Sequence, residues 1–165
     1  MNPVAACVVL ALVLAGCIAE PSGMAADETP RFYRSLARAD AAVDAVTAQA
    51  MIGAYRANQG LAPVELDPDL ERLARAEARA MAAADWPTSA DAVKGRLAAE
   101  GFTGPGANLS ASYHTLAEAF SGWRDSPQHN RVLLDPKARR MGIATAYAPG
   151  SKYKVYWAFL TAAQR

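Results

Sequence analysis

Only two histidines occur in the chain, and each is a candidate for chemistry near neutral pH. His129 follows Ser126 and Pro127, a pair that typically begins a helix, with Ser126 as the N-cap. The Ser126 hydroxyl would then accept the backbone N–H of His129, and the positive end of the helix would keep the imidazole neutral. His129 could act as a general base or ligand contact, or it could close a turn and donate a structural hydrogen bond. The structural interpretation is favoured.

Catalysis by His129 would need a second titratable group within hydrogen-bond reach. Ser126, Asp125 and Tyr113 are the neighbours in sequence that could supply one, but a serine three residues before a histidine is not a recognised nucleophile arrangement. The catalytic candidates are therefore His129 and Ser126, and a non-catalytic role is favoured. His114 precedes another helix and is interpreted as an exposed loop residue, with a contact at a cleft rim as the alternative.

The N-terminal segment indicates export. The apolar run Val4–Leu14 is too short for a membrane-spanning helix, which needs about twenty residues, but it fits a signal sequence. It ends in Leu14-Ala15-Gly16-Cys17, which resembles a bacterial lipobox and makes Cys17 the predicted site of lipidation. An ordinary cleaved secretion signal is the alternative. The other cysteine, Cys7, lies in the same segment, so no disulfide is expected in the mature domain.

The length predicts one domain, and the export signal predicts an extracytoplasmic location for it. The predicted divisions are a lipoprotein signal at 1–17, a spacer with an N-terminal helical extension at 18–40, and a single domain at 41–165. The 17 Lys and Arg residues nearly balance the 16 Asp and Glu residues without a basic stripe, so nucleic acid is excluded as a partner. Ile18 after the cysteine favours the outer membrane if the cell has two.

Helical signals occupy the first two thirds of the chain. Apolar spacings of three and four predict a helix from Pro30 toward Asn58, interrupted near Asp40. Asp67-Pro68 should begin a second helix, whose mostly apolar stripe includes Glu77. A third helix should follow Ser89. Thr115 and Glu118 form a predicted capping box for the next one.

The end of the chain changes to the alternation of β-strands. Residues 141–147 and 153–159 alternate on either side of Pro149-Gly150-Ser151, which predicts a hairpin, and Asn108–Ser112 is a further short strand. Tyr156 and Leu160 place large apolar side chains on one face of the last strand, and Trp157 and Phe159 place them on the other. Such a strand should be covered on both faces. The prediction is an α+β domain with helices on both sides of a small antiparallel sheet.

Three segments, in this order, resemble the CAP superfamily (cysteine-rich secretory proteins, antigen five and pathogenesis-related proteins) in its short bacterial form. They are Ile52–Val64, Gly106-Ala107-Asn108-Leu109 and Trp123–Leu134, and Met141-Gly142-Ile143 adds a fourth match. The resemblance covers about residues 46–160. It implies a three-layer α-β-α sandwich.

The family resemblance also implies a cleft that holds two histidines and two glutamates and binds a divalent metal in some members. His129 matches one of the histidines, whereas Ala107 and Ser126 stand at the two glutamate positions. The other histidine is missing from the stretch between Trp86 and Ser89. Because a zinc site needs at least three protein ligands, no metal and no cofactor are expected.

The predicted function is that of an envelope-anchored binding module with a degenerate cleft. Its partners would be the membrane, through a lipid anchor at Cys17, and an unidentified lipid, glycan or protein ligand. The alternative is a hydrolase that acts on an envelope polymer or peptide through His129. Trp86, Trp123 and Trp157 could line a ligand groove, but packing in the core or at half-exposed positions is favoured for them. A structural hydrogen bond is favoured for Asn108. The predicted cleft residues are His129, Ser126, Asn108, Ala107 and His114.

Overall fold

The computed structural model describes residues 29–165, so the predicted signal, Cys17 and most of the spacer lie outside the described residues. The helices are α1 (Ala45–Asn58), α2 (Pro68–Ala84), α3 (Ala90–Ala99), α4 (Leu116–Asp125) and α5 (Pro127–Leu133). The strands are β1 (Glu65–Leu66), β2 (Gly106–Ala111), β3 (Arg140–Tyr147) and β4 (Val155–Ala162). None of the helices in this part of the chain is both long and apolar enough to cross a membrane.

The four strands form one sheet in the order β1-β3-β4-β2. The predicted hairpin is confirmed, because β3 pairs antiparallel with β4 from Arg140↔Ala162 to Tyr147↔Val155. The sheet is mixed, however, and not wholly antiparallel as predicted. Two residues of the connector after α1 form β1 and pair parallel with the start of β3. Strand β2 pairs only with β4, which leaves its other edge free.

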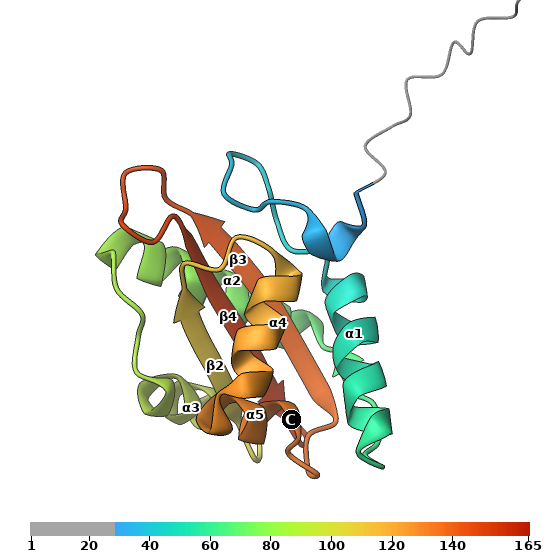
Figure 1. The fold of residues 1–165 in the computed structure, drawn as a ribbon. Coiled ribbons are helices and arrows are strands. Elements are labelled where there is room, and N and C mark those ends of the chain that lie inside the picture. The colour runs from blue at the N-terminus through green and yellow to red at the C-terminus, as the bar shows by residue number, and fades with distance from the viewer. Residues whose placement is uncertain (1–28) are drawn as a thin grey trace, which may run out of the picture.

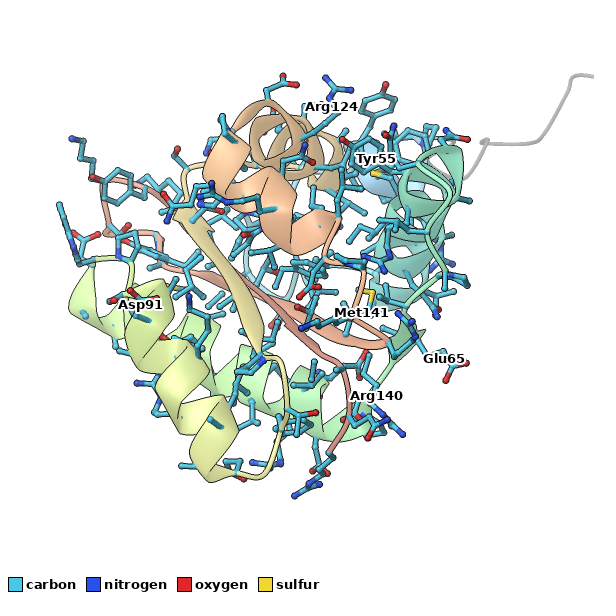
Figure 2. All side chains as sticks on the ribbon, turned by 90° about the horizontal axis from the view of Figure 1, so that it is seen from below. Tyr55, Glu65, Asp91, Arg124, Arg140 and Met141 are labelled. Carbon is cyan, nitrogen blue, oxygen red and sulfur yellow. The ribbon has the colours of Figure 1, made fainter. Side chains whose placement is uncertain are left out.

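Helices cover both faces of the sheet, as the large side chains on both faces of β4 predict. Helices α2 and α3 lie on one face, and α1, α4 and α5 lie on the other (Figures 1 and 2). All eight residues of β4 are buried, with Trp157 and Phe159 in the core under α1 and α4, and Tyr156 and Leu160 in the core under α2. The three-layer α-β-α sandwich is therefore confirmed.

A glycine lets α2 lie directly on the sheet. A Cβ atom at Gly142 in β3 would come within 2.2 Å of the carbonyl carbon of Leu70 and within 2.4 Å of the backbone nitrogen of Glu71. Any side chain at this position would push the helix away from the strand, because packed interiors leave no room for an added group. The apolar stripe of α2 then packs on β3 and β4, and this places α3 beside β2.

The helix boundaries follow capping chemistry more closely than apolar spacing. The Asp67-Pro68 start and the Thr115–Glu118 capping box are both confirmed. Of the helix predicted from Pro30 toward Asn58 with an interruption near Asp40, the second part is found as α1, which begins after Asp44. The first part is wrong, because only residues 31–33 form a 3-10 turn there. The Asp44 carboxylate accepts the backbone N–H of Thr47 at 2.8 Å and so provides a start that spacing alone does not reveal.

Candidate functional site

The free edge of β2 lies between α3 and α5, and an open cleft of about 550 Å³ lies at the start of this strand. Strand β2 contributes Gly106 and Ala107, which are both buried. Helix α5 contributes Gln128 and Arg131, which share one face at helical spacing, and Asp135 follows shortly after the end of this helix. Helix α3 and the residues before it contribute the opposite wall. Figure 2 shows α3, with Asp91 labelled, and the α4–α5 layer on opposite sides of this strand.

Charged side chains of both signs line the cleft. Asp91 and Lys94 form an ion pair at 2.6 Å, and the hydrogen bond from Lys94 lowers the pKa of Asp91. Asp135 faces them from the end of α5, and its carboxylate accepts the backbone N–H of Lys137 at 2.8 Å. Arg131 forms no ion pair with any residue of 29–165. The cleft is therefore polar, close to neutral in total charge, and holds one cation available to a ligand.

A buried arginine fixes the wall that α5 provides. Arg56 in α1 is fully buried, and its guanidinium donates to the carbonyl oxygens of Ala62 at 2.8 Å, Leu133 at 2.8 Å, Asp135 at 3.0 Å and Ala138 at 3.2 Å. Burial lowers the pKa of Arg56. The rigid guanidinium carries N–H donors in a fixed arrangement, and these satisfy the backbone carbonyl groups that the end of α5 leaves without helical partners. The position of Asp135 in the cleft thus depends on a residue of α1.

His129 does not face this cleft. It stands one turn before Leu133, which is buried, and on the side of α5 away from Arg131. Its Nδ1 atom is buried without a hydrogen-bond partner, and burial lowers the pKa of the imidazole, so the ring is neutral at pH 7. The predicted direction of the pKa shift is confirmed, but its cause is burial and not the helix end.

Ser126 does not cap α5 as the sequence predicts. It occupies the N-cap position, but its side chain makes no capping hydrogen bond, and its backbone carbonyl accepts the N–H of Asn130 at 2.8 Å. Ser126 also ends α4, where its own N–H bonds to the carbonyl of Gly122 at 3.2 Å. One residue thus joins two helices, and its backbone makes the hydrogen bonds at both ends.

The structure separates the other predicted cleft residues. Asn108 is fully buried and donates from Nδ2 to the carbonyl of His129 at 3.0 Å, so it ties β2 to α5, as the structural interpretation states. Ala107 points to the opposite face of the sheet and lines the cleft. His114 is exposed at the start of α4, whereas His129 follows the end of that helix. Of the five predicted residues, only Ala107 lines this cleft.

Two of the three tryptophans lie in the core, as the favoured interpretation expects, and Trp86 does not. Trp123 and Trp157 are fully buried and pack edge to face with ring centroids 5.9 Å apart. Their ring nitrogens donate to Ser110 Oγ at 3.1 Å and to the Tyr113 carbonyl at 2.8 Å. Trp86 is 66% exposed beyond the end of α2. Within residues 29–165, no group of three or more His, Cys, Asp or Glu side chains is placed to hold a metal ion.

The segments that carry the family resemblance meet in space, since β2 packs beside α5 and Arg56 of α1 binds the end of α5. Residues 49–161 match the family described as "CAP: Cysteine-rich secretory protein family". The chain belongs to the CAP family. A comparison with curated proteins finds no match for this CAP domain.

Solved structures share the CAP fold at low sequence identity. A cysteine-rich secretory protein from Staphylococcus aureus is similar with a TM-score of 0.60 and 18% identity, over 72% of this chain and 38% of that one. An extracellular protein containing an SCP domain from Bacillus anthracis gives 0.59 and 18%, over 71% and 39% of the two chains. An outer surface protein from Borrelia burgdorferi gives 0.62 and 16%, over 76% and 98%. The chain thus spans under half the length of the first two proteins.

Sequence reasoning missed most of the residues that line the cleft. Asp91, Lys94, Arg131 and Asp135 read as ordinary exposed charges on helices or loops, and no spacing motif connects α3 with α5. One signal was available for a different buried charge. Glu77 stands in the apolar stripe of α2, a position that predicts a buried carboxylate, and the structure buries it.

Proposed function

We propose that this chain is an extracytoplasmic CAP-domain lipoprotein that binds a polar envelope ligand, a glycan or a peptide, along the free edge of β2. The observation that carries the proposal is the polar cleft of about 550 Å³ between α3 and α5, beside the start of β2. The charged side chains that line it offer charge-assisted hydrogen bonds to a polar chain molecule. A lipid tail would find few apolar partners there. The extracellular and outer-surface descriptions of two similar structures agree with a location outside the cytoplasm.

Arg131 provides the test of the ligand proposal. We expect soluble peptidoglycan fragments to bind the protein, and envelope lipids not to bind it, in titration calorimetry. Arg131→Ala should weaken binding about tenfold, because one charge-assisted hydrogen bond is lost. Arg75→Ala, an exposed arginine on α2 outside the cleft, is the matched control. Equal affinity in the Arg131 and Arg75 variants, or the absence of fragment binding, would count against this site.

Anchoring at Cys17 is a separate part of the proposal. A lipobox-like Leu14-Ala15-Gly16-Cys17 supports acylation, and two or three acyl chains suffice for stable membrane attachment. Mass spectrometry of the exported protein should find an N-terminal peptide that begins with a diacylglyceryl-modified Cys17. Separation of the envelope by density should place the protein in the outer membrane if the cell has two membranes. An unmodified N-terminal peptide would indicate an ordinary cleaved signal.

Hydrolysis through His129 is less well supported than binding. The neighbours that could assist the imidazole are engaged elsewhere: Asp125 pairs with Arg124 at 2.9 Å, and the Tyr113 hydroxyl lies against Gly122. We therefore expect His129→Ala to retain binding of peptidoglycan fragments, and we expect native protein to leave those fragments uncleaved in chromatography. Cleavage by native protein that His129→Ala abolishes would favour the hydrolase instead.

A further inference from the structure

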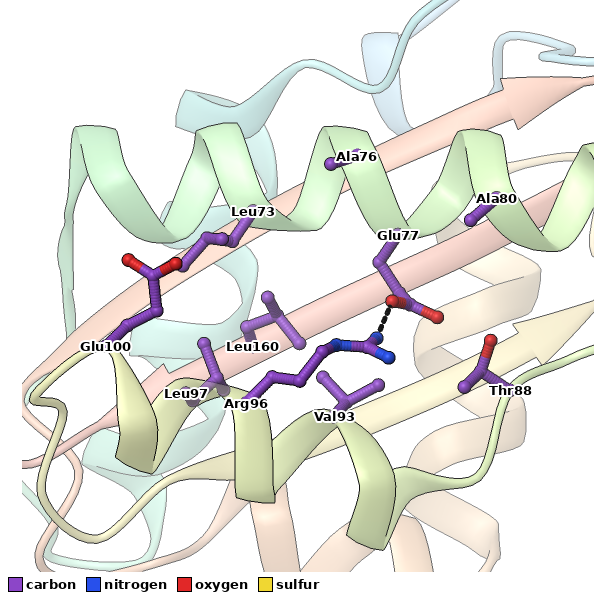
Figure 3. A pocket seen from close by; sticks show the side chains of 10 residues that line it. All are labelled: Leu73, Ala76, Glu77, Ala80, Thr88, Val93, Arg96, Leu97, Glu100 and Leu160. Carbon is purple, nitrogen blue, oxygen red and sulfur yellow. Dashed lines mark hydrogen bonds and ion pairs between the residues drawn. The ribbon is translucent and has the colours of Figure 1, made fainter.

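A second cavity lies between α2 and α3, on the face of the sheet that these two helices cover. Its volume is about 320 Å³, which is within the range of small-molecule sites. The side chains of Leu73, Val93, Leu97 and Leu160 form its apolar part (Figure 3). Ala76 and Ala80 are exposed on α2 and leave the cavity open to solvent. Nothing in the CAP resemblance assigns a role to this cavity.

A buried carboxylate points into one end of the cavity. Glu77 is only 7% exposed, and one of its oxygens, Oε2, accepts a hydrogen bond from Arg96. The other oxygen, Oε1, is buried and has no hydrogen-bond partner. Figure 3 shows the Glu77 carboxylate and the Thr88 hydroxyl at the same end of the cavity, whereas Leu73 and Leu97 lie toward the opposite end. The Glu100 carboxylate lies at that opposite end, near Leu73, so the cavity has a carboxylate at each end and apolar side chains along its walls.

The end of the cavity at Glu77 is suited to a ligand group that donates a hydrogen bond rather than to one that accepts it. A carboxylate oxygen can only accept hydrogen bonds, and a buried acceptor without a partner is unfavourable. Glu77 and Glu100 place two negative charges on the cavity walls against the single positive charge of Arg96. A cationic donor satisfies both the unpaired oxygen and the charge excess, and an anionic head group satisfies neither.

We propose that the cavity between α2 and α3 binds an aliphatic primary amine. Its ammonium group donates a hydrogen bond to the Glu77 carboxylate, which turns to present its buried Oε1 to the cavity, and its alkyl chain packs on Leu73, Leu97 and Leu160. This site is distinct from the cleft beside β2, because Val93 and Leu97 of α3 line the cavity, whereas Asp91 and Lys94, on another face of that helix, line the cleft. It therefore stands independently of the proposed envelope ligand.

The test compares n-octylamine with octanoate at pH 7, using the full-length chain with Cys17→Ser so that no acyl group is attached. We expect n-octylamine to bind saturably in titration calorimetry and to raise the Tm, because a ligand that binds only the folded state stabilises it. Octanoate has a chain of the same length with the opposite charge and should leave the Tm unchanged. Binding of octanoate as tight as that of n-octylamine, or no saturable binding of n-octylamine, would overturn the proposal.

Two variants locate the bound amine. Ala80→Phe adds a ring at an exposed position that lines the cavity, and it should reduce n-octylamine affinity about tenfold or more by occupying the space. Ala83→Phe, at an exposed position of the same helix outside the cavity, should leave the affinity unchanged. Glu77→Gln should also weaken binding, and its circular dichroism and Tm report whether the fold survives loss of the pair with Arg96. Native affinity in Ala80→Phe would place the amine elsewhere and refute the site.

Discussion

Single buried polar groups carry much of the specificity of this fold. Arg56 forms no ion pair within the described part of the chain and instead donates to four carbonyl oxygens in two loops and a helix end. Asn108 ties the edge strand to α5 in the same way, through the carbonyl of His129. Buried polar groups specify a unique packing when they are hydrogen-bonded, because any other arrangement leaves them unpaired.

Arg56 should be among the residues most sensitive to substitution. Arg56→Met retains the aliphatic stem but leaves the carbonyls of Leu133, Asp135 and Ala138 without donors. We expect the free energy of unfolding to fall by about 3 kcal/mol, as it does when a buried charged network loses a partner. Urea denaturation measures the change. Arg72→Met, which removes an exposed pair with Asp69, is the control and should change stability by less than about 1 kcal/mol.

His129 should make stability depend on pH near neutrality. Burial lowers its pKa below the usual 6.5, so the unfolded chain binds this proton more tightly than the folded chain. The free energy of unfolding should therefore be unaffected well above pH 6.5, fall as the pH drops below that value, and level off below the folded-state pKa. Denaturation at a series of pH values measures the loss.

Variants of the two histidines show which of them causes the dependence of stability on pH. His129→Gln has no titrating ring and should lose less stability than the native protein when the pH falls through this range. His114→Gln is the matched control, because His114 is exposed and contacts its surroundings through its backbone. If the native protein and His129→Gln show the same slope of stability against pH, the buried imidazole does not contribute to it.

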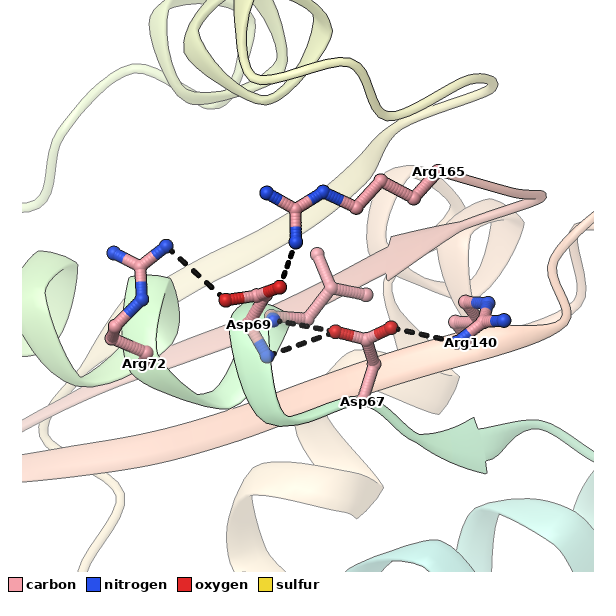
Figure 4. A network of polar contacts seen from close by, with 6 residues as sticks. Asp67, Asp69, Arg72, Arg140 and Arg165 are labelled. Carbon is pink, nitrogen blue, oxygen red and sulfur yellow. Dashed lines mark hydrogen bonds and ion pairs between the residues drawn. The ribbon is translucent and has the colours of Figure 1, made fainter.

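At the scale of elements, one carboxylate links the start of α2 to the sheet. Asp67 Oδ1 accepts the backbone N–H groups of Asp69 and Leu70 at 2.9 and 3.0 Å, and Oδ2 accepts from Arg140 of β3 at 2.9 Å (Figure 4). Asp69 meets Arg165 at the end of the chain, but that ion pair is exposed. The two aspartates are thus close in sequence and very different in burial.

Asp67→Ala should destabilise the protein more than Asp69→Ala. Loss of the N-cap alone costs about 1 kcal/mol, and the ion pair with Arg140 is lost as well, so we expect a decrease of about 2 kcal/mol. Removing the exposed pairs of Asp69 should cost about 0.5 kcal/mol. Thermal unfolding of both variants gives the comparison. Equal effects would mean that the buried cap adds nothing beyond a surface ion pair.

Sequence patterns predicted the elements whose signals are local. Asp67-Pro68, the Thr115–Glu118 box and the alternation in β4 each depend on residues within a few positions, and each was found. The strand β1 was not predictable, because two residues carry no period and pair only when β3 is beside them. The segment before Asp44 has helical spacing because Phe32, Leu36 and Val43 reach the core, yet it does so as irregular chain.

The candidate site was less predictable than the fold. The family resemblance directed attention to His129, but the cleft depends on which face of α5 is exposed, and that follows from Leu133 and Arg56 on the other face. Whether Ser126 caps with its side chain depends on the angle between α4 and α5, which no local pattern contains. The Glu77–Arg96 pair joins residues on different helices, so spacing could not connect them.

At the scale of the whole molecule, two cores share one strand. Trp123 and Trp157 lie in the core under α1 and α4, whereas Leu160 lies in the core under α2 and α3. Because every residue of β4 is buried and all but Thr161 belong to one core or the other, neither layer can separate without exposing the strand that supports the opposite layer. The CAP domain should therefore unfold in a single cooperative transition.

Leu160→Ala tests this coupling, because it creates a cavity on the face away from the buried tryptophans. We expect the free energy of unfolding to fall by about 2–5 kcal/mol, from lost apolar burial and the cavity left behind. Tryptophan fluorescence reports mainly on the opposite core, and far-ultraviolet circular dichroism reports on all helices. If β4 couples the layers, the variant shifts both denaturation curves to the same lower midpoint. A fluorescence midpoint that stays at the native value while the circular dichroism midpoint falls would mean that the layers unfold independently.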